Sequence, residues 1–153
     1  MPTFELLYVS TRPRKTTDQI VVDDIVLPAM RVNRALDITG CLWFGPTRFL
    51  QILEGEKDVV EELYARIQQD TRHRDVRLVH SGPIAARSFQ RWAMHPIKGS
   101  ETDEISALLS TLAPNAVPLT APASTPTRVP ENCSLRVKLL SLATRKHAGT
   151  PHA

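Results

Sequence analysis

Five side chains in the sequence are suited to moving electrons and protons or to switching hydrogen bonds: Tyr8, Asn33, Gln51, Trp92 and Met94. A phenol can give up an electron and a proton, and a primary amide can donate and accept hydrogen bonds at once. Gln51 is the most informative, because it is polar and stands inside the apolar run FLQIL. Buried without a partner, its amide would cost about 1 to 3 kcal/mol.

Taken one at a time, these residues also have simpler explanations. Strand alternation can point Gln51 to solvent, which is the simpler reading of that residue alone. Tyr8, Trp92 and Met94 are each typical of core packing, and Asn33 could be a solvated helix residue. Their meaning therefore depends on whether the fold brings them together.

Common catalytic and metal-binding patterns are absent from the sequence. There is no GxGxxG, P-loop, HExxH or GxSxG motif, so we expect no enzyme. Cys41 and Cys133 are too far apart for paired zinc ligands and are expected to be reduced thiols. The histidines share no ligand spacing, so no metal site is predicted. They are His73, His80, His95, His147 and His152.

Length and composition predict one domain with a tail. The chain has 153 residues, of which 42% are hydrophobic and 23% are charged. No apolar run approaches the roughly 18 residues of a membrane span, and the first residues lack a secretory signal, so we expect a cytoplasmic protein. The net charge of +3 is spread along the chain, which argues against nucleic-acid binding.

Hydrophobic periodicity predicts five strands and two helices before residue 98. The first helix should begin near Asp24, capped by Asp23 or Asp24, with Pro28 close to its first turn. A GPTR turn should join two strands as a hairpin. In chain order the expected elements are a strand at 4–10, a helix at 24–36, strands at 38–44 and 49–53, a helix at 57–69, and strands at 76–80 and 89–95.

This order matches an α+β, ferredoxin-like βαββαββ sheet with two helices on one face. Residues 1–98 would form this domain, and residues 99–153 a C-terminal extension. The extension is expected to contain a helix at about 102–112, a Pro-rich linker at 113–131 and a helix at about 132–146 capped by Asn132.

Five segments together resemble the BLUF domain, a blue-light sensor that uses FAD, in its short stand-alone type. The resemblance covers residues 4 to about 97. It is carried by LLYVS around Tyr8, NRALDITG at 33–40, RFLQILEG at 48–55, LYARIQQDTRHRDV at 63–76 and RWAM at 91–94. Each segment is weak alone, but the five follow the order and spacing of the family.

The resemblance implies a role for each matching position. Asn33 would bind the carbonyl edge of the flavin, Gln51 would bridge the flavin and Tyr8, and Arg66 with Asp70 would hold the polar side of the cofactor. Trp92 and Met94 would read out the signal. Candidate apolar walls are Ile25, Ile38, Phe49 and Ile67. FAD is the expected cofactor, with FMN or riboflavin as alternatives.

The implied mechanism is a light-driven rearrangement of hydrogen bonds. Light would make Tyr8 supply an electron while Gln51 relays its proton, and Gln51 would end rotated or tautomerised, with a new bond to a flavin carbonyl. The signal would pass through the C-terminal helices to a downstream signalling protein. Leucines in those helices need burial, which favours a homodimer. Two departures from the family pattern are Val32, often polar there, and Pro28 in the first helix.

Two other readings of the same architecture stay open. One is a flavin-free, ferredoxin-like module that binds protein or RNA, although the aromatic signature of RNA-recognition strands is absent. The other is a small acylphosphatase-like hydrolase, for which the loop TRPRKTT would have to cradle an anion.

Overall fold

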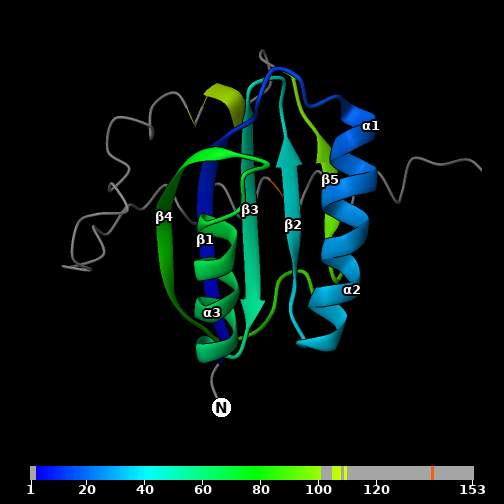
Figure 1. Cartoon of the computed structure of the whole chain (residues 1–153). Coiled ribbons are helices and arrows are strands. Elements are labelled where there is room, and N and C mark those ends of the chain that lie inside the picture. Colours follow the sequence, from blue (N-terminus) through cyan, green and yellow to red (C-terminus); the bar gives the residue numbers. More distant parts are fainter. Residues whose placement is uncertain (1–2, 101–104, 108, 110–138, 140–153) are drawn as a thin grey trace, which may run out of the picture.

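The computed structural model describes residues 3–100, 105–107, 109 and 139. Helical segments and strands follow one another along the chain in the order that the sequence predicts (Figure 1). They are β1 (Thr3–Thr11), α1 (Asp18–Ile20), η1 (Val21–Val26), α2 (Leu27–Ala35), β2 (Thr39–Phe44), β3 (Arg48–Gly55), α3 (Lys57–Gln68), β4 (Arg74–Ile84) and β5 (His95–Lys98).

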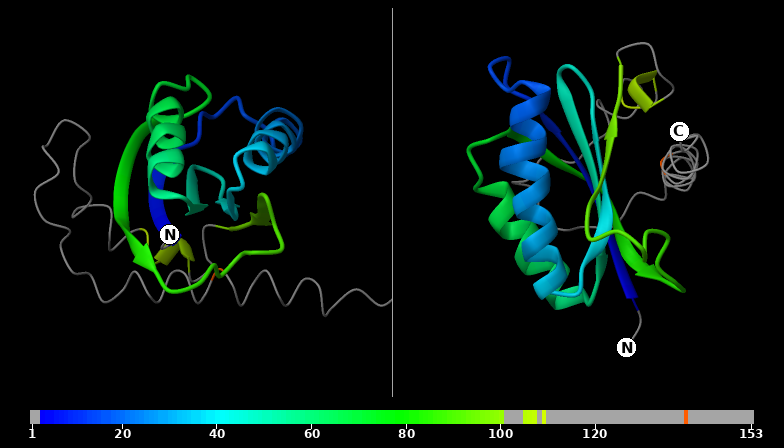
Figure 2. Two further views of the ribbon diagram at one scale, coloured as in Figure 1. Left: turned by 90° about the horizontal axis from the view of Figure 1, so that it is seen from below. Right: turned by 90° about the vertical axis from the view of Figure 1, so that its right-hand side faces the viewer.

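The strands form one five-stranded sheet in the order β4-β1-β3-β2-β5. Neighbours are antiparallel except β5, which runs parallel to β2. Both helical segments lie on one face of the sheet, α3 over β1 and the α1–α2 segment toward β2 and β5 (Figure 2). The predicted α+β, ferredoxin-like fold with one added strand is thus confirmed.

The register of the two central strands places two of the chemically interesting residues side by side. Tyr8 on β1 is the cross-strand partner of Gln51 on β3. Directly opposed residues in antiparallel strands point to the same face, and here that face lies under the helices. On the other side of Gln51, Leu42 of β2 is its partner.

Apolar side chains form a core on each face of the sheet. The first core lies between the sheet and the helices and includes Tyr8, Leu42 and Met94. The second lies on the opposite face, around Trp43, Leu50 and Phe89, where Ile105, Leu109 and Leu139 of the extension are almost fully buried.

Beyond residue 100, the C-terminal extension is described at only five positions. Residues 105–107, 109 and 139 are helical, and the helices expected at about 102–112 and 132–146 stay predictions. The rest of both helices, the Pro-rich linker, Asn132 and Cys133 lie outside the described residues, and the domain boundary at residue 98 stays a prediction.

The first helical segment begins earlier than the sequence analysis expected. Thr17, rather than Asp23 or Asp24, caps it by accepting a hydrogen bond from the backbone N–H of Ile20. Residues 21–26 then form a π-helix, which leads into α2 with Pro28 near its start. Pro28 has no N–H to donate, and the wider i→i+5 bonding before it lets the helix continue into the proline without a break.

The last strand lies later in the chain than predicted. β5 begins at His95, so Trp92 and Met94 belong to the connection after β4 and not to a strand at 89–95. β4 is also longer than expected and continues through Gly82 and Pro83 to Ile84. As an edge strand it can include a proline, because that residue needs no partner on its outer side. Among the described residues, no helix combines the length and the apolar character needed to cross a membrane.

Gly40 provides a test of the packing between β2 and β3. A Cβ at Gly40 would lie 1.9 Å from the carbonyl oxygen of Ile52, whereas one at Gly82 would meet nothing closer than 3.7 Å. We therefore expect Gly40→Ala to lower the free energy of unfolding in urea by about 1 to 3 kcal/mol or more, because backbone must move. Gly82→Ala is the control and should stay within about 1 kcal/mol of wild type. Equal losses in the two variants would contradict this account.

Candidate functional site

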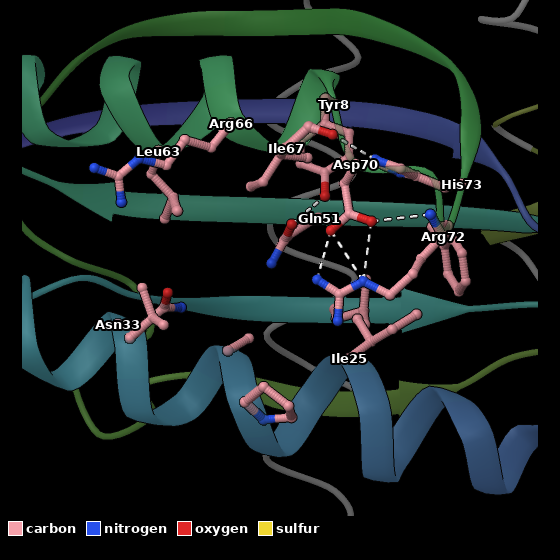
Figure 3. Close-up of a pocket in the computed structure, with 15 residues that line it drawn as sticks. Tyr8, Ile25, Asn33, Gln51, Leu63, Arg66, Ile67, Asp70, Arg72 and His73 are labelled. Atoms are coloured by element: carbon pink, nitrogen blue, oxygen red, sulfur yellow. Dashed lines mark hydrogen bonds and ion pairs between the residues drawn. The ribbon is translucent and has the colours of Figure 1, made fainter.

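A cleft of about 250 Å³ opens between the two helical segments, above the central strands (Figure 3). Its floor contains Tyr8, Leu42, Phe49 and Gln51, which come from β1, β2 and β3. Its sides come from η1 and α2 on one hand and from α3 and the residues after it on the other. The lining residues from these sides are Ile25, Pro28, Ala29, Val32, Asn33, Leu63, Arg66, Ile67, Asp70, Arg72 and His73.

A hydrogen-bond chain crosses the floor of this cleft. The Tyr8 hydroxyl donates to Oε1 of Gln51, and Nε2 of Gln51 donates to Sδ of Met94 at 3.4 Å. Gln51 is only 6% exposed, so strand alternation points it into the cleft and not to bulk solvent. Its amide has a partner at each end, as the cost of burying it requires.

The environment of Tyr8 keeps its phenol neutral. Burial raises the pKa of Tyr8, and the neighbouring Tyr64 and Asp70 act in the same direction. The Tyr64 ring meets the Tyr8 ring edge to face, with centroids 5.5 Å apart. Burial also raises the pKa of Tyr64 to about 12. A neutral phenol retains the proton that it donates to Gln51.

Trp92 and Met94 lie on different sides of the sheet. Met94 is fully buried in the core under the helices and contacts Gln51, whereas Trp92 packs against the core on the opposite face. Strict alternation would have put both on one face, but these residues precede β5 and are not held to strand geometry. Of the two, the structure therefore brings only Met94 to Gln51.

Asn33 joins α2 to the segment that carries Met94. Its side-chain Nδ2 donates to the backbone carbonyl of Ala93 at 2.7 Å, and its backbone carbonyl accepts from the N–H of Ile38 at 2.8 Å. Asn33 is 2% exposed, although it lines the cleft. An amide nitrogen carries two hydrogens, so the bond to Ala93 leaves a second donor on the same atom.

Charged groups gather at one end of the cleft. Asp70 accepts from Nε of Arg72 at 3.0 Å, and this hydrogen bond lowers the pKa of Asp70. Arg72 also donates to the backbone carbonyl of Asp24 in η1, which connects the two walls of the cleft. Pro28, four residues after Asp24, cannot give that carbonyl an α-helical hydrogen bond. Arg66 is exposed and pairs with Glu62 at 3.0 Å.

Arg72 and His73 are cleft residues that the sequence analysis did not single out. His73 contacts the Ile67 carbonyl through Nε2 at 2.7 Å and Ser10 Oγ through Nδ1 at 2.8 Å. A carbonyl only accepts, so Nε2 carries the hydrogen. Both residues stand in the segment DTRH, directly after Asp70. The signal in the sequence that could have identified them as cleft residues is their short distance from the end of α3.

Three of the four predicted apolar wall residues lie in the lining of the cleft. Ile25, Phe49 and Ile67 line it, but Ile38 does not. Ile38 follows Asp37, whose backbone has a φ of 53°. This turn directs the Ile38 side chain into the core, where it is 1% exposed and lies beside the position of Gly55.

The cleft has the character of a site for a flat, partly polar ring. Its walls are largely aliphatic, its floor presents an amide and a phenol, and its charged end presents a carboxylate and a guanidinium. Such a ligand would bury its faces on the walls and exchange hydrogen bonds at its edges. A flavin ring, with carbonyl and N–H groups on one edge, fits this set of donors and acceptors.

Comparison with known proteins agrees with this geometry. The family model for BLUF, sensors of blue light using FAD, matches residues 3–95. Photoactivated adenylate cyclase subunit beta of Euglena longa is 38% identical over 111 residues, which are 71% of this chain and 12% of that subunit. The blue light- and temperature-regulated antirepressor BluF of Escherichia coli K12 is 34% identical over 73 residues, 48% of this chain and 18% of that protein.

Solved structures give the same result. BlsA in its photo-activated state superposes with a TM-score of 0.69 and 29% identity, over 90% of this chain and 94% of BlsA. BlrB in its dark state has a TM-score of 0.63 and 26% identity, over 92% of this chain and 96% of BlrB. From the sequence match, the fold and the cleft together, we conclude that this chain belongs to the BLUF family of blue-light sensors.

Proposed function

We propose that this protein is a blue-light photoreceptor that binds FAD in the cleft between α2 and α3 and signals to a partner protein. The observation that carries the proposal is the series of hydrogen bonds from Tyr8 through Gln51 on the cleft floor to the buried Met94, in a member of the BLUF family. When bound, the flavin would supply the absorption of blue light and an acceptor for an electron. FMN or riboflavin would present the same ring.

The side chains around the cleft divide into holding and switching groups. Asn33 would donate its second amide hydrogen to a carbonyl of the ring, and Asp70 and Arg72 would bind the polar edge. Arg66, an exposed residue of the cleft lining, would bind a phosphate of the cofactor. Ile25 and Ile67 would cover the faces of the ring and exclude water.

The switch would be the amide of Gln51. Tyr8 would supply an electron and then its proton through Gln51, and both would return to it. Since an amide has a donor end and an acceptor end, a rotated or tautomerised Gln51 would exchange the bond to Met94 for one to the cofactor. Only a side chain has to move, which suits a rapid switch in a packed core.

The signal would leave the site through Met94 and β5. Met94 directly precedes β5, which pairs with β2 and contributes Ile97 to the core on the far face. Ile105, Leu109 and Leu139 of the C-terminal extension pack on that same core. Their burial within the chain removes part of the reason for expecting a dimer. The dimer stays a prediction, and so does the cytoplasmic location.

The loop TRPRKTT is poorly arranged for the alternative of an anion-binding hydrolase. Arg12 is 7% exposed and directs its guanidinium to the carbonyls of Thr16 and Gly45 and to the carboxylate of Asp18. Its donors face inward, so it does not present them to a substrate. We therefore prefer the flavin-binding proposal to the hydrolase.

The first test is an absorption spectrum in the dark and directly after blue light. We expect a flavin spectrum that shifts slightly to the red and recovers in the dark. Gln51→Leu should bind flavin but lose the shift, because leucine cannot exchange hydrogen bonds. Gln19→Leu, on exposed α1, is the matched control and should behave as wild type. A colourless wild-type protein that ignores added FAD would exclude the proposal.

A second test uses the raised pKa of Tyr8. Above about pH 10 the unfolded chain releases the tyrosine proton while the buried phenol keeps it, so stability falls as the pH rises. In urea unfolding, wild type should lose about 1 kcal/mol more than Tyr8→Phe between pH 9 and 11. Tyr8→Phe should also abolish the red shift. The same pH dependence in both proteins would show that Tyr8 ionises freely in the fold.

A further inference from the structure

Glu54 is a buried carboxylate on the strand that carries the switch. It lies three residues after Gln51 on β3, on the opposite face of the sheet, and it is 0% exposed. Burial raises its pKa, and Glu5, its buried cross-strand partner on β1, acts in the same direction. A carboxylate is an expensive group to place there unless it is well bonded.

Three donors converge on this carboxylate. Oε2 accepts from the backbone N–H of Ser88 at 2.7 Å, and Oε1 accepts from the N–H of Phe89 at 2.9 Å and from the hydroxyl of Thr39 at 3.0 Å. Thr39 in turn accepts from Nη1 of Arg87 at 3.2 Å. Because a hydroxyl has one hydrogen, the bond from Arg87 aligns that hydrogen toward Glu54.

The two backbone groups that Glu54 binds begin the segment 88–94, which ends at Met94. Further along this segment, the carbonyl of Trp92 accepts from the N–H of Gly40 at 3.0 Å, and the carbonyl of Ala93 accepts from Asn33. No regular helix or strand hydrogen bonds hold residues 88–94. The packing of Phe89 and Met94 in the two cores and these few hydrogen bonds therefore set the position of the segment relative to Gln51.

We propose that Glu54 is a positioning residue of the photocycle, which holds the segment 88–94 so that Met94 lies against Gln51 in the dark state. β3 would thus carry the switch on one face and the anchor of its readout segment on the other. The acceptor-only carboxylate suits this task, because both of its oxygens face donors. The inference rests on the proposed light-driven switch at Gln51.

Glu54→Gln in the flavin-loaded protein is the principal test. The amide keeps the shape of the side chain but turns one acceptor into a donor that faces a backbone N–H. We expect the amide proton signal of Ser88 or Phe89 to move upfield, and the light-minus-dark change of the Met94 methyl signal to decrease. Dark recovery should slow by about threefold or more, because the dark arrangement loses support.

Thr39 gives a second pair of variants that leaves Glu54 in place. Thr39→Val keeps the β-branched shape but removes the hydroxyl between Arg87 and Glu54, so recovery should slow in the same direction. Thr39→Ser keeps the hydroxyl and should restore the wild-type rate. This pair decides the question even if Glu54→Gln does not fold.

Two controls separate positioning from general effects. Glu61→Gln changes an exposed glutamate of α3, and Val76→Ala weakens the core at β4, away from the segment 88–94. Both should keep the wild-type Met94 signal and recovery rate. If wild type shows no light-induced shift, the proposed function fails. If wild type shifts but the Glu54 and Thr39 variants recover at its rate with an unchanged Met94 signal, only the role of Glu54 is wrong.

Discussion

The site depends on the register between β1 and β3, which sets Tyr8 directly opposite Gln51. A slip of one residue would turn one of the two to the other face and break their hydrogen bond. The apolar residues on either side fix this register, because Leu7 and Ile52, also partners, must both reach the core on the far face. The same packing that stabilises the sheet therefore aligns the phenol with the amide.

The two walls of the cleft above this pair are held in place by different contacts. α3 packs on β1, whereas the η1–α2 wall is linked across the cleft by the Arg72 guanidinium at the carbonyl of Asp24. A π-helix and Pro28 in that wall leave backbone groups outside the regular α-helical pattern. Irregular backbone of this kind is common where a ligand has to be accommodated.

The sequence predicted the order of strands and helices and most of the cleft, because patterns of period 2 and 3.6 are local properties. It did not predict the start of the first helix, because Thr17 and neither of the two aspartates caps that helix. It also did not predict the bounds of β5, because the partner strand β2 is far away in the chain. Ile38 was assigned to the cleft for a different reason, since a turn at Asp37 and not the alternation of a strand sets the direction of its side chain.

The separation of Trp92 from Met94 limits how a signal could leave the cleft. Met94 contacts Gln51 under the helices, and Trp92, two residues before it, packs on the far face with Phe89. The chain therefore crosses the edge of the sheet between them, close to where Asn33 binds Ala93. A movement of Met94 would alter the packing on both faces of the sheet, because this short segment contributes side chains to both cores. If Glu54 holds this segment as proposed, the response of the segment to Gln51 would be a choice between discrete packings, as a switch requires.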